Sequence, residues 1–212
     1  MTDLILALDV TKKEEAVAIA KACAPHIDAI KIGYPLVLGA GLSIANTLKE
    51  TGLPLIADFK VADIPNTNTL IAERVFSVGF SAIICHGFVG TDSVKACVKT
   101  AHEKGGECYV VAEMSHPGAK EFFVPGTPEQ IAANAMLAKA DGIIAPATRP
   151  ERVKVLRNIV GSRKILSPGI GAQGGDVYAV ANLVDGVIVG RSIYGAPDPS
   201  AAARTFARDL RS

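Results

Sequence analysis

The sequence predicts an α/β protein, a (β/α)8 (TIM) barrel formed by a single domain over residues 1–212. Short apolar runs alternate with longer amphipathic segments along the whole chain, which is typical of a parallel sheet covered by helices. Eight such repeats give about 26 residues per unit, which is compact for a barrel but feasible with short loops. The alternative is an open doubly wound sheet, but no G-x-G-x-x-G follows the first run, where that fold places its dinucleotide fingerprint. Glycine and proline are scattered rather than gathered in a linker, which favours one domain.

Eight short and almost uniformly apolar runs are predicted as strands. They are Leu4–Leu8, Ala29–Ile32, Leu55–Ala57, Ala82–Cys85, Tyr109–Ala112, Gly142–Ala145, Lys164–Leu166 and Gly186–Val189. The segments between and after them have the spacing of amphipathic helices. They are Lys13–Ala24, Leu42–Glu50, Thr69–Val78, Asp92–Lys104, Pro128–Lys139, Pro150–Ile159, Gly175–Asn182 and Ser200–Leu210.

Ionisable and polar residues stand where the predicted strands end. They include Asp9, Lys31, Asp58, Lys60, Asp63, His86, Glu113, Ser115, Thr148 and Arg191. In a (β/α)8 barrel the chemistry lies at the carboxyl ends of the strands. This distribution therefore predicts a site at that end of the barrel.

The stretch LIADFKVADIPNT, Leu55 to Thr67, carries the densest cluster of charge. Alternate residues of a strand share a face, so Asp58 and Lys60 are expected to point the same way, with Asp63 close enough to complete an Asp–Lys–Asp array. Acids on either side would hold the lysine in its charged form. The alternative is an ordinary surface salt bridge at a strand end.

Two glycine-containing segments follow the last two predicted strands. They are SPGIGAQGG, Ser167 to Gly175, and VGRSI, Val189 to Ile193. Glycines let backbone N–H groups approach an anion, and the loops after strands seven and eight are the usual phosphate site of phosphate-binding barrels. Arg191 would add a charge-assisted contact. The alternative is a pair of plain glycine turns.

The segment SHPGAKEFFVPGT, Ser115 to Thr127, is long for a connection between a strand and a helix. Long loops without their own structure are often lids over active sites. The alternative is a surface insertion packed by Phe122 and Phe123.

Composition narrows the possible partners. The net charge of +1 gives no general attraction to nucleic acid or to an anionic membrane surface, and no apolar stretch is long enough to span a bilayer. The four cysteines form no C-x-x-C pair and the four histidines have no zinc-site spacing, so we expect no metal. A reduced, cytoplasmic protein is the prediction.

The motif DFKVADIPNT, together with LALD, IKIG, EMSHPG and SPGIGAQGG, resembles the orotidine 5′-phosphate decarboxylase family in its compact, archaeal form. The resemblance covers essentially the whole chain, with the motifs in order on successive predicted strands. It implies a metal- and cofactor-independent decarboxylation of orotidine 5′-monophosphate to uridine 5′-monophosphate, the last step of de novo pyrimidine synthesis. It also implies a homodimer with active sites at the interface.

The resemblance assigns roles to matching residues. Lys60 would protonate the ring carbon, Asp58 would face the departing carboxylate, and Lys31 and Asp63 would complete a Lys–Asp–Lys–Asp catalytic array. Asp63 and Thr67 would reach the neighbouring subunit's site. The implied substrate-binding residues are Asp9, Lys31, Asp58, Lys60, Asp63, Ile64, Thr67, Ser115, Pro168, Gly169, Gln173, Gly190 and Arg191.

Three other functions fit parts of the pattern. Keto-sugar-phosphate decarboxylases and hexulose-phosphate synthases resemble this family around D-x-K-x-x-D but use magnesium, with an acidic ligand where this chain has the cation Lys31. A Schiff-base aldolase needs a neutral lysine in an apolar pocket, whereas acids flank Lys60. A catalytically silent binder of phosphorylated ligands has no need for the acid–lysine array.

Overall fold

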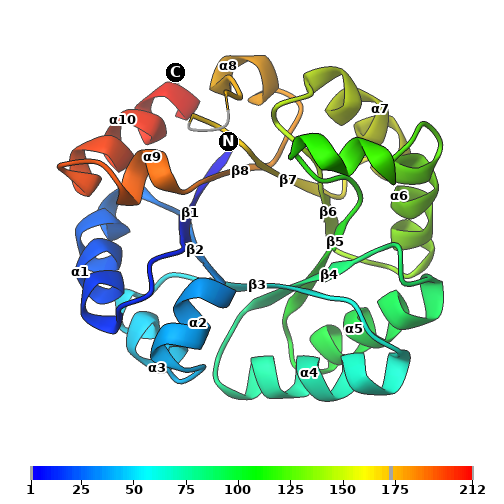
Figure 1. Cartoon of the computed structure of the whole chain (residues 1–212), viewed down its shortest axis with the longest axis horizontal. Coiled ribbons are helices and arrows are strands. Elements are labelled where there is room, and N and C mark those ends of the chain that lie inside the picture. The colour runs from blue at the N-terminus through cyan, green and yellow to red at the C-terminus, as the bar shows by residue number, and fades with distance from the viewer. Residues whose placement is uncertain (1, 172–173, 212) are drawn as a thin grey trace.

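A computed structural model describes residues 2–171 and 174–211, and its architecture is a closed barrel of eight parallel strands surrounded by helices (Figure 1). The strands are β1 (Asp3–Leu8), β2 (Ala29–Gly33), β3 (Leu55–Val61), β4 (Ala82–His86), β5 (Glu107–Val111), β6 (Gly142–Ile144), β7 (Lys164–Pro168) and β8 (Gly186–Val189). Each strand pairs with the next in sequence, and β8 pairs with β1 to close the ring. The predicted barrel and its eight strands are confirmed.

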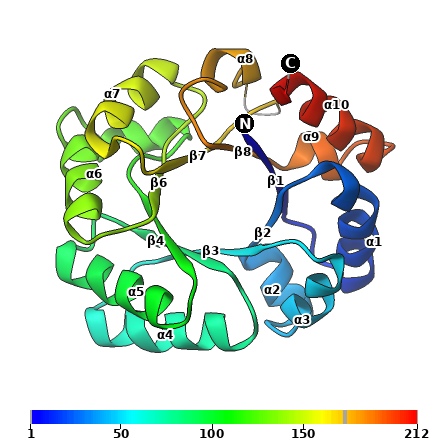
Figure 2. The ribbon, with the colours of Figure 1, turned by 180° about the vertical axis from the view of Figure 1, so that it is seen from behind.

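Helices follow the strands and cover the outside of the ring, as the view from behind also shows (Figure 2). The α-helices are α1 (Lys13–Cys23), α2 (Tyr34–Ala40), α3 (Ile44–Leu48), α4 (Pro65–Ser77), α5 (Thr91–Glu103), α6 (Thr127–Leu137), α7 (Pro150–Val160), α8 (Val177–Val180), α9 (Arg191–Tyr194) and α10 (Pro199–Arg211). Short 3₁₀ turns are η1 (Ala24–His26), η2 (Lys49–Thr51) and η3 (Pro117–Glu121). No helix among residues 2–171 and 174–211 is long and apolar enough to cross a membrane.

Two buried layers hold the barrel together. The larger cluster fills the space between the strands and the helices and contains alternate residues of β1, Leu4, Leu6 and Leu8. A second cluster lies inside the ring and takes the other residues, including Ile5 and Ala7. Because strands buried on both faces need apolar residues at every position, this arrangement explains the uniformly apolar runs of the sequence. All four cysteines are buried as free thiols.

Three differences from the sequence-based boundaries affect the site. Strand β3 continues to Val61 rather than ending at Ala57, so Asp58 and Lys60 are part of the strand. Helix α4 begins at Pro65 instead of Thr69, because a proline at the first helical position fits the helix without requiring an N–H donor. The short helices α2 and α9, which follow β2 and β8 directly, were not predicted from the sequence.

Candidate active site

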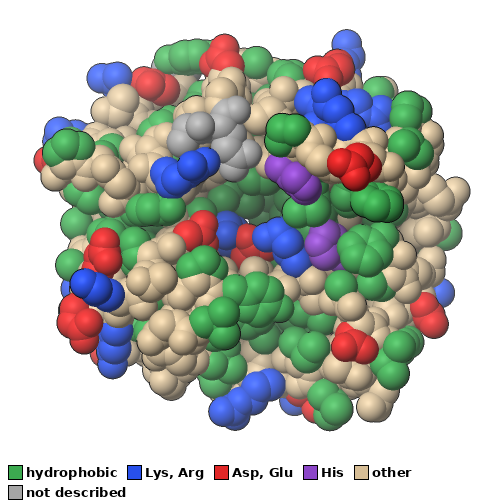
Figure 3. Space-filling model, viewed as in Figure 1, with side chains coloured by type: hydrophobic (Ala, Val, Ile, Leu, Met, Phe, Trp, Pro, Cys, Tyr) green, Lys and Arg blue, Asp and Glu red, His purple; other side chains and the backbone are tan. Residues whose placement is uncertain are grey.

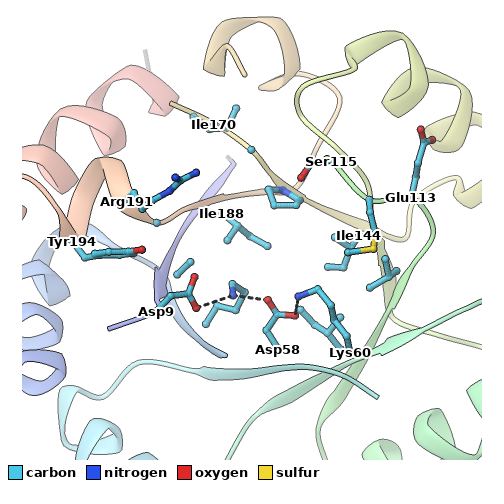
Figure 4. A pocket seen from close by; sticks show the side chains of 18 residues that line it. Asp9, Asp58, Lys60, Glu113, Ser115, Ile144, Ile170, Ile188, Arg191 and Tyr194 are labelled. Carbon is cyan, nitrogen blue, oxygen red and sulfur yellow. Dashed lines mark hydrogen bonds and ion pairs between the residues drawn. The ribbon is translucent and has the colours of Figure 1, made fainter. Parts of the chain in front are cut away.

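A cavity of about 240 Å³ opens at the carboxyl ends of the strands. Figure 3 shows acidic and basic side chains gathered across the centre of this face, and Figure 4 shows side chains from several strands converging on the cavity. Its lining residues are Ala7, Asp9, Lys31, Asp58, Lys60, Ile84, Val111, Glu113, Met114, Ser115, Ile144, Pro168, Gly169, Ile170, Ile188, Gly190, Arg191 and Tyr194. The cavity therefore lies at the carboxyl ends of the strands, where the sequence predicted a site.

A chain of ion pairs crosses the floor of this cavity. The Nζ of Lys31 lies 2.5 Å from one carboxylate oxygen of Asp58, and the Nζ of Lys60 lies 2.7 Å from the other. The Nζ of Lys31 is also 3.8 Å from Asp9. The side chains of Lys31 and Asp58 are only 7% and 10% exposed, whereas that of Lys60 is 38% exposed. Lys60 is therefore the cation of the pair that solvent or a ligand can reach.

The backbone at Lys60 departs from regular strand geometry. Lys60 has φ of 44°, in the left-handed region that residues with a Cβ seldom adopt. The register of β3 against β4 shifts between Ala57 and Val61, which is where a bulge would place an extra residue. Such a conformation costs about 1–3 kcal/mol and persists only where surrounding packing imposes it. The strain coincides with the reachable lysine.

Electrostatics keep Asp58 ionised. Burial by itself would raise the pKa of this carboxyl, but the charges and hydrogen bonds of Lys31 and Lys60 outweigh burial and lower it below its usual value. A buried carboxylate with two ammonium partners is an anion held in place. The cavity thus presents a fixed negative charge next to a fixed positive one.

His86 ends β4 beside this charge array. Burial, and then the positive charge of Lys60, lower its pKa from 6.5 to about 4, although Asp58 acts in the opposite direction. Its ring packs against Phe88 with centroids 4.6 Å apart, and its buried Nδ1 has no hydrogen-bond partner among the described residues. The imidazole is therefore neutral near pH 7.

The remaining floor of the cavity is apolar. Ile84, Val111, Ile144 and Ile188 come from four different strands and belong to the cluster inside the ring. Sequence reasoning missed all four because they read as core residues. The usable signal was their position, since each is the last inward-facing residue of its strand or close to it.

The predicted anion-binding segments line the opposite side of the cavity from Lys60 (Figure 4). Pro168 and Gly169 come from the end of β7, and Gly190 and Arg191 come from the β8–α9 junction. Gly169 has φ of 102°, a conformation that favours glycine. Gln173, which the resemblance assigned to the same grip, lies outside the described residues.

Tyr194 also lines the cavity and was not predicted. Its ring lies over Gly190, where an added Cβ would come within 3.4 Å of the ring edge. In Figure 4 its hydroxyl points into the cavity on the side of Asp9 and Arg191. Burial, and then the negative charge of Asp9, raise the pKa of this phenol, so the hydroxyl is a hydrogen-bond donor. Sequence reasoning missed it because no helix was predicted directly after the eighth strand, where α9 begins.

Asp63 does not line the cavity and, among the described residues, forms no ion pair with Lys60, so one chain by itself does not show the Asp–Lys–Asp array. Strand β3 ends at Val61 and the chain turns outward into α4, which carries Asp63, Ile64 and Thr67 away from Lys60. The Asp63 carboxylate accepts a hydrogen bond from the Ile64 N–H, 2.7 Å away, and is exposed. The reach of Asp63 and Thr67 into a neighbouring subunit stays a prediction.

Ser115, at the start of the 115–127 loop, lines the cavity as predicted. The loop is not without structure, because η3 occupies its first half. Phe122 is 79% exposed, whereas Phe123 packs against the core. Phe123 thus anchors the loop, while the Phe122 side chain is exposed to solvent. A role of the loop as a lid stays a prediction.

Fold and site together define an enzyme of the (β/α)8 class with a lysine–aspartate–lysine array at the carboxyl ends of its strands. The model of the orotidine 5′-phosphate decarboxylase / HUMPS family matches residues 2–206. The orotidine 5′-phosphate decarboxylase of Methanococcoides burtonii is 56% identical over 209 residues, covering 98% of this chain and 96% of the relative. That of Thermococcus kodakarensis is 51% identical, covering 98% and 96%.

Solved structures agree with the sequence relatives. Orotidine 5′-monophosphate decarboxylase from Methanocaldococcus jannaschii, complexed with the inhibitor BMP, superposes with a TM-score of 0.96 at 42% identity, with all of both chains covered. The Pyrococcus horikoshii enzyme superposes with a TM-score of 0.90 at 46% identity, with 99% of each chain covered. The chain belongs to the orotidine 5′-phosphate decarboxylase / HUMPS family.

Proposed function

We propose that this protein decarboxylates orotidine 5′-monophosphate to uridine 5′-monophosphate and carbon dioxide, with residues 1–212 acting as one catalytic domain. The observation that carries the proposal is the Lys31–Asp58–Lys60 array, with N–O distances of 2.5 and 2.7 Å, on the floor of a cavity in a member of this family. The relatives named above carry the same activity in their names.

Decarboxylation requires the enzyme to stabilise a negative charge on a carbon of the pyrimidine ring. When the bond between the pyrimidine ring and its carboxylate breaks, the electron pair stays in the ring plane, where no adjacent π system can delocalise it. The ammonium of Lys60 stabilises this charge and then transfers its proton to the same carbon. Solvent water restores the proton on the neutral amine, which is possible because the Lys60 side chain is 38% exposed.

Asp58 and Lys31 prepare Lys60 for this role. Asp58 fixes the Lys60 ammonium through a 2.7 Å ion pair and is itself fixed by the nearly buried Lys31. Because these charges are already oriented before the substrate arrives, little reorganisation is needed during the reaction. The apolar floor of Ile84, Val111, Ile144 and Ile188 excludes water from the departing carbon dioxide, which strengthens the electrostatic interactions above it.

The substrate phosphate would bind at Gly169, Gly190 and Arg191, which line the cavity, and Figure 4 shows Arg191 on the side away from Lys60. Asp9 would accept hydrogen bonds from ribose hydroxyls. Binding energy from the phosphate, remote from the reacting bond, can serve catalysis by ordering the 115–127 loop over the cavity.

The reaction is proposed to need no metal. The family model also covers HUMPS enzymes, so the distinction rests on the site itself. Lys31 lies in β2, two residues before its end, and its ammonium together with that of Lys60 would repel a divalent cation from Asp58. The flanking carboxylate also argues against a Schiff-base mechanism for Lys60.

A second copy of the chain is proposed to complete the site. Large apolar side chains are exposed at α2 and at the start of α4, namely Tyr34, Leu38, Ile64 and Leu70. A shallow groove between the same elements is lined by residues such as Val37, Leu42 and Ile71. The described part of the chain offers no cation to the neighbouring Asp63 carboxylate. A dimer through this face would bury the patch and present Asp63 and Thr67 to the partner.

The activity is tested by following the ultraviolet absorbance of orotidine 5′-monophosphate with and without a chelator. Fast loss of substrate, with equal amounts of uridine 5′-monophosphate and carbon dioxide and no effect of the chelator, is expected. No loss of substrate would refute the proposed function, and loss only without the chelator would refute the metal-free route.

The shared site is tested by mixing two impaired variants, Lys60→Ala and Asp63→Ala. A mixed dimer would contain one site with both native residues, so random reassociation should restore about a quarter of wild-type activity. Each variant alone is the control. No gain on mixing, in a sample shown by sedimentation to have exchanged subunits, would contradict a site made by two chains.

A further inference from the structure

Arg152 on α7 contacts carboxylates at both ends of the 115–127 loop. Its Nε lies 3.0 Å from Oε2 of Glu113, and its Nη1 lies 2.8 Å from Oε1 of Glu129. Glu113 is two residues before Ser115, where the loop begins, and Glu129 is two residues after Thr127, where it ends. One guanidinium thus joins the two ends of a thirteen-residue segment (Ser115 to Thr127).

The contact with Glu113 is sheltered from solvent and so holds more strongly than a surface ion pair, whereas the Glu129 side chain is 27% exposed. The Glu113 side chain is 5% exposed, and in Figure 4 its carboxylate points away from the centre of the cavity. Glu129 also accepts a hydrogen bond from the Gly126 N–H, 3.0 Å away, which ties the last turn of the loop to the start of α6. The hydrogen bond with Arg152 lowers the pKa of Glu129, so this carboxylate stays ionised.

We propose that Arg152 is a positioning residue that clamps both ends of the 115–127 loop and thereby sets Ser115 at the rim of the cavity. This inference rests on the proposed function, because it assigns Arg152 a part in that reaction. Arg152 does not line the cavity and would act only through the loop.

The chemistry of the side chain explains why the residue is arginine. A guanidinium is planar and offers separate donors on two edges, so it can bind two carboxylates in fixed directions at once. A lysine ammonium is a single point charge and would hold both with less directional control. Fixing the loop ends in advance lowers the conformational entropy that must be lost when the loop orders over a substrate.

Loss of Arg152 should leave the fold intact. Glu113 keeps a second partner, since Nη2 of Arg149 lies 3.1 Å away and the same side chain donates to the carbonyl of Met114. The buried carboxylate is therefore not left without a cation when Arg152 is changed. What is lost is the link between the two ends of the loop.

The same helix offers a matched control. Arg157, at the other end of α7, pairs with Asp185 at 2.5 Å and donates to the carbonyls of Leu183, Gly161 and Arg163. It is as sheltered as Arg152, with side chains 23% and 22% exposed, but contacts nothing in the loop. Arg157→Met therefore imitates the structural damage of Arg152→Met without touching the loop.

The test compares Arg152→Met, Arg152→Lys and Arg157→Met. For Arg152→Met we expect kcat/KM for orotidine 5′-monophosphate to fall about 10- to 100-fold, because a small misplacement of a substrate-positioning group has effects of this size. Arg152→Lys should recover part of this loss. Arg157→Met should show a similar shift in Tm and no loss of kcat/KM.

Hydrogen–deuterium exchange supplies a readout that does not depend on activity. Amides of residues 115–127 should exchange faster in Arg152→Met than in wild type, and at the wild-type rate in Arg157→Met. Equal exchange in this segment for all variants would overturn the clamp. If the wild-type protein failed to decarboxylate the substrate while exchange still rose in Arg152→Met, the clamp would stand and the proposed function would fall.

Discussion

The two rims of the barrel carry the same kinds of charged residues but use them differently. At the amino ends of the strands, Glu107 pairs with Lys164 at 2.8 Å, and Arg157 pairs with Asp185 at 2.5 Å. Asp185 also accepts a hydrogen bond from the backbone N–H of Ile165. Each of these two acids is bound to another part of the same rim.

At the carboxyl ends, pairing is incomplete and the open groups face the cavity. Asp58 is fully engaged by two lysines, but Lys60 keeps a reachable side and Arg191 is exposed. The backbone of Lys60 is strained, with φ of 44°, and among the described residues outside glycine only Lys139, with φ of 62°, shares a positive φ. The charges at the amino-end rim are paired with one another and stabilise the fold, while some of those at the carboxyl-end rim are available to a ligand.

The largest effect should come from the reachable lysine. Lys60→Ala removes both the stabilising charge and the proton donor, so we expect kcat to fall about 10⁴-fold or more. Binding of uridine 5′-monophosphate, measured by calorimetry, should survive and serves as the control for a folded site. Turnover near the wild-type rate would contradict the role of Lys60.

The next effect concerns the opposite side of the same cavity. Arg191→Ala should lower kcat/KM for orotidine 5′-monophosphate about 100-fold, because it removes a charge-assisted contact to phosphate. Affinity for free uridine, which has no phosphate, should be unchanged. Equal losses for nucleotide and nucleoside would refute the phosphate grip.

A change at the amino-end rim should affect stability alone. Asp185→Ala leaves the Ile165 N–H and Arg157 without this acceptor, so the free energy of unfolding should fall by about 2 kcal/mol. Urea unfolding measures the loss, and steady-state kinetics should give the wild-type kcat. A large drop in kcat in a folded sample would contradict the claim that the amino-end rim contributes to stability and not to catalysis.

His86 should add a pH dependence of stability at the carboxyl-end rim. Its pKa of about 4 in the fold lies below the 6.5 of an unperturbed histidine, so the unfolded chain binds the proton first as pH falls. The contribution of His86 to the free energy of unfolding is fully present above pH 6.5 and is lost as pH falls toward 4. After allowance for partial exposure this amounts to about 1–2 kcal/mol.

Urea unfolding at several pH values between 7 and 4 checks this contribution. His86→Gln should flatten the decline relative to wild type, whereas His116→Gln, in the exposed part of the loop, should follow the wild-type curve. Parallel curves for all three proteins would show that His86 is not responsible.

The smallest effect separates strain from chemistry at one position. Lys60→Gly and Lys60→Ala both lack the amine, but only glycine tolerates φ of 44° at little cost. Glycine has the greater entropy in the unfolded chain, which by itself would make Lys60→Gly the less stable of the two variants. Because relief of strain opposes this, the free energy of unfolding of Lys60→Gly should equal that of Lys60→Ala or exceed it by up to about 1 kcal/mol. If alanine is the more stable by that amount, the backbone at this position is not strained in solution.

The sequence by itself determined the barrel, its eight strands and the residues that meet at their carboxyl ends. Strand alternation is a local property, so Asp58 and Lys60 could be placed on one face from their spacing alone. Lys31 could be placed at the same rim because every parallel strand ends there. The same local logic cannot place Asp63, because it lies beyond the end of β3 at Val61, where strand alternation no longer applies.

Only the tertiary structure decided which distant residues touch. Tyr194 enters the cavity because a short helix follows β8 directly, and Arg152 meets Glu113, 39 residues away in the chain, because α7 packs beside the end of β5. Such contacts depend on the closure of the ring and on how each helix lies against it. These are properties of the whole fold, and the hydrophobic periodicity of a single segment cannot predict them.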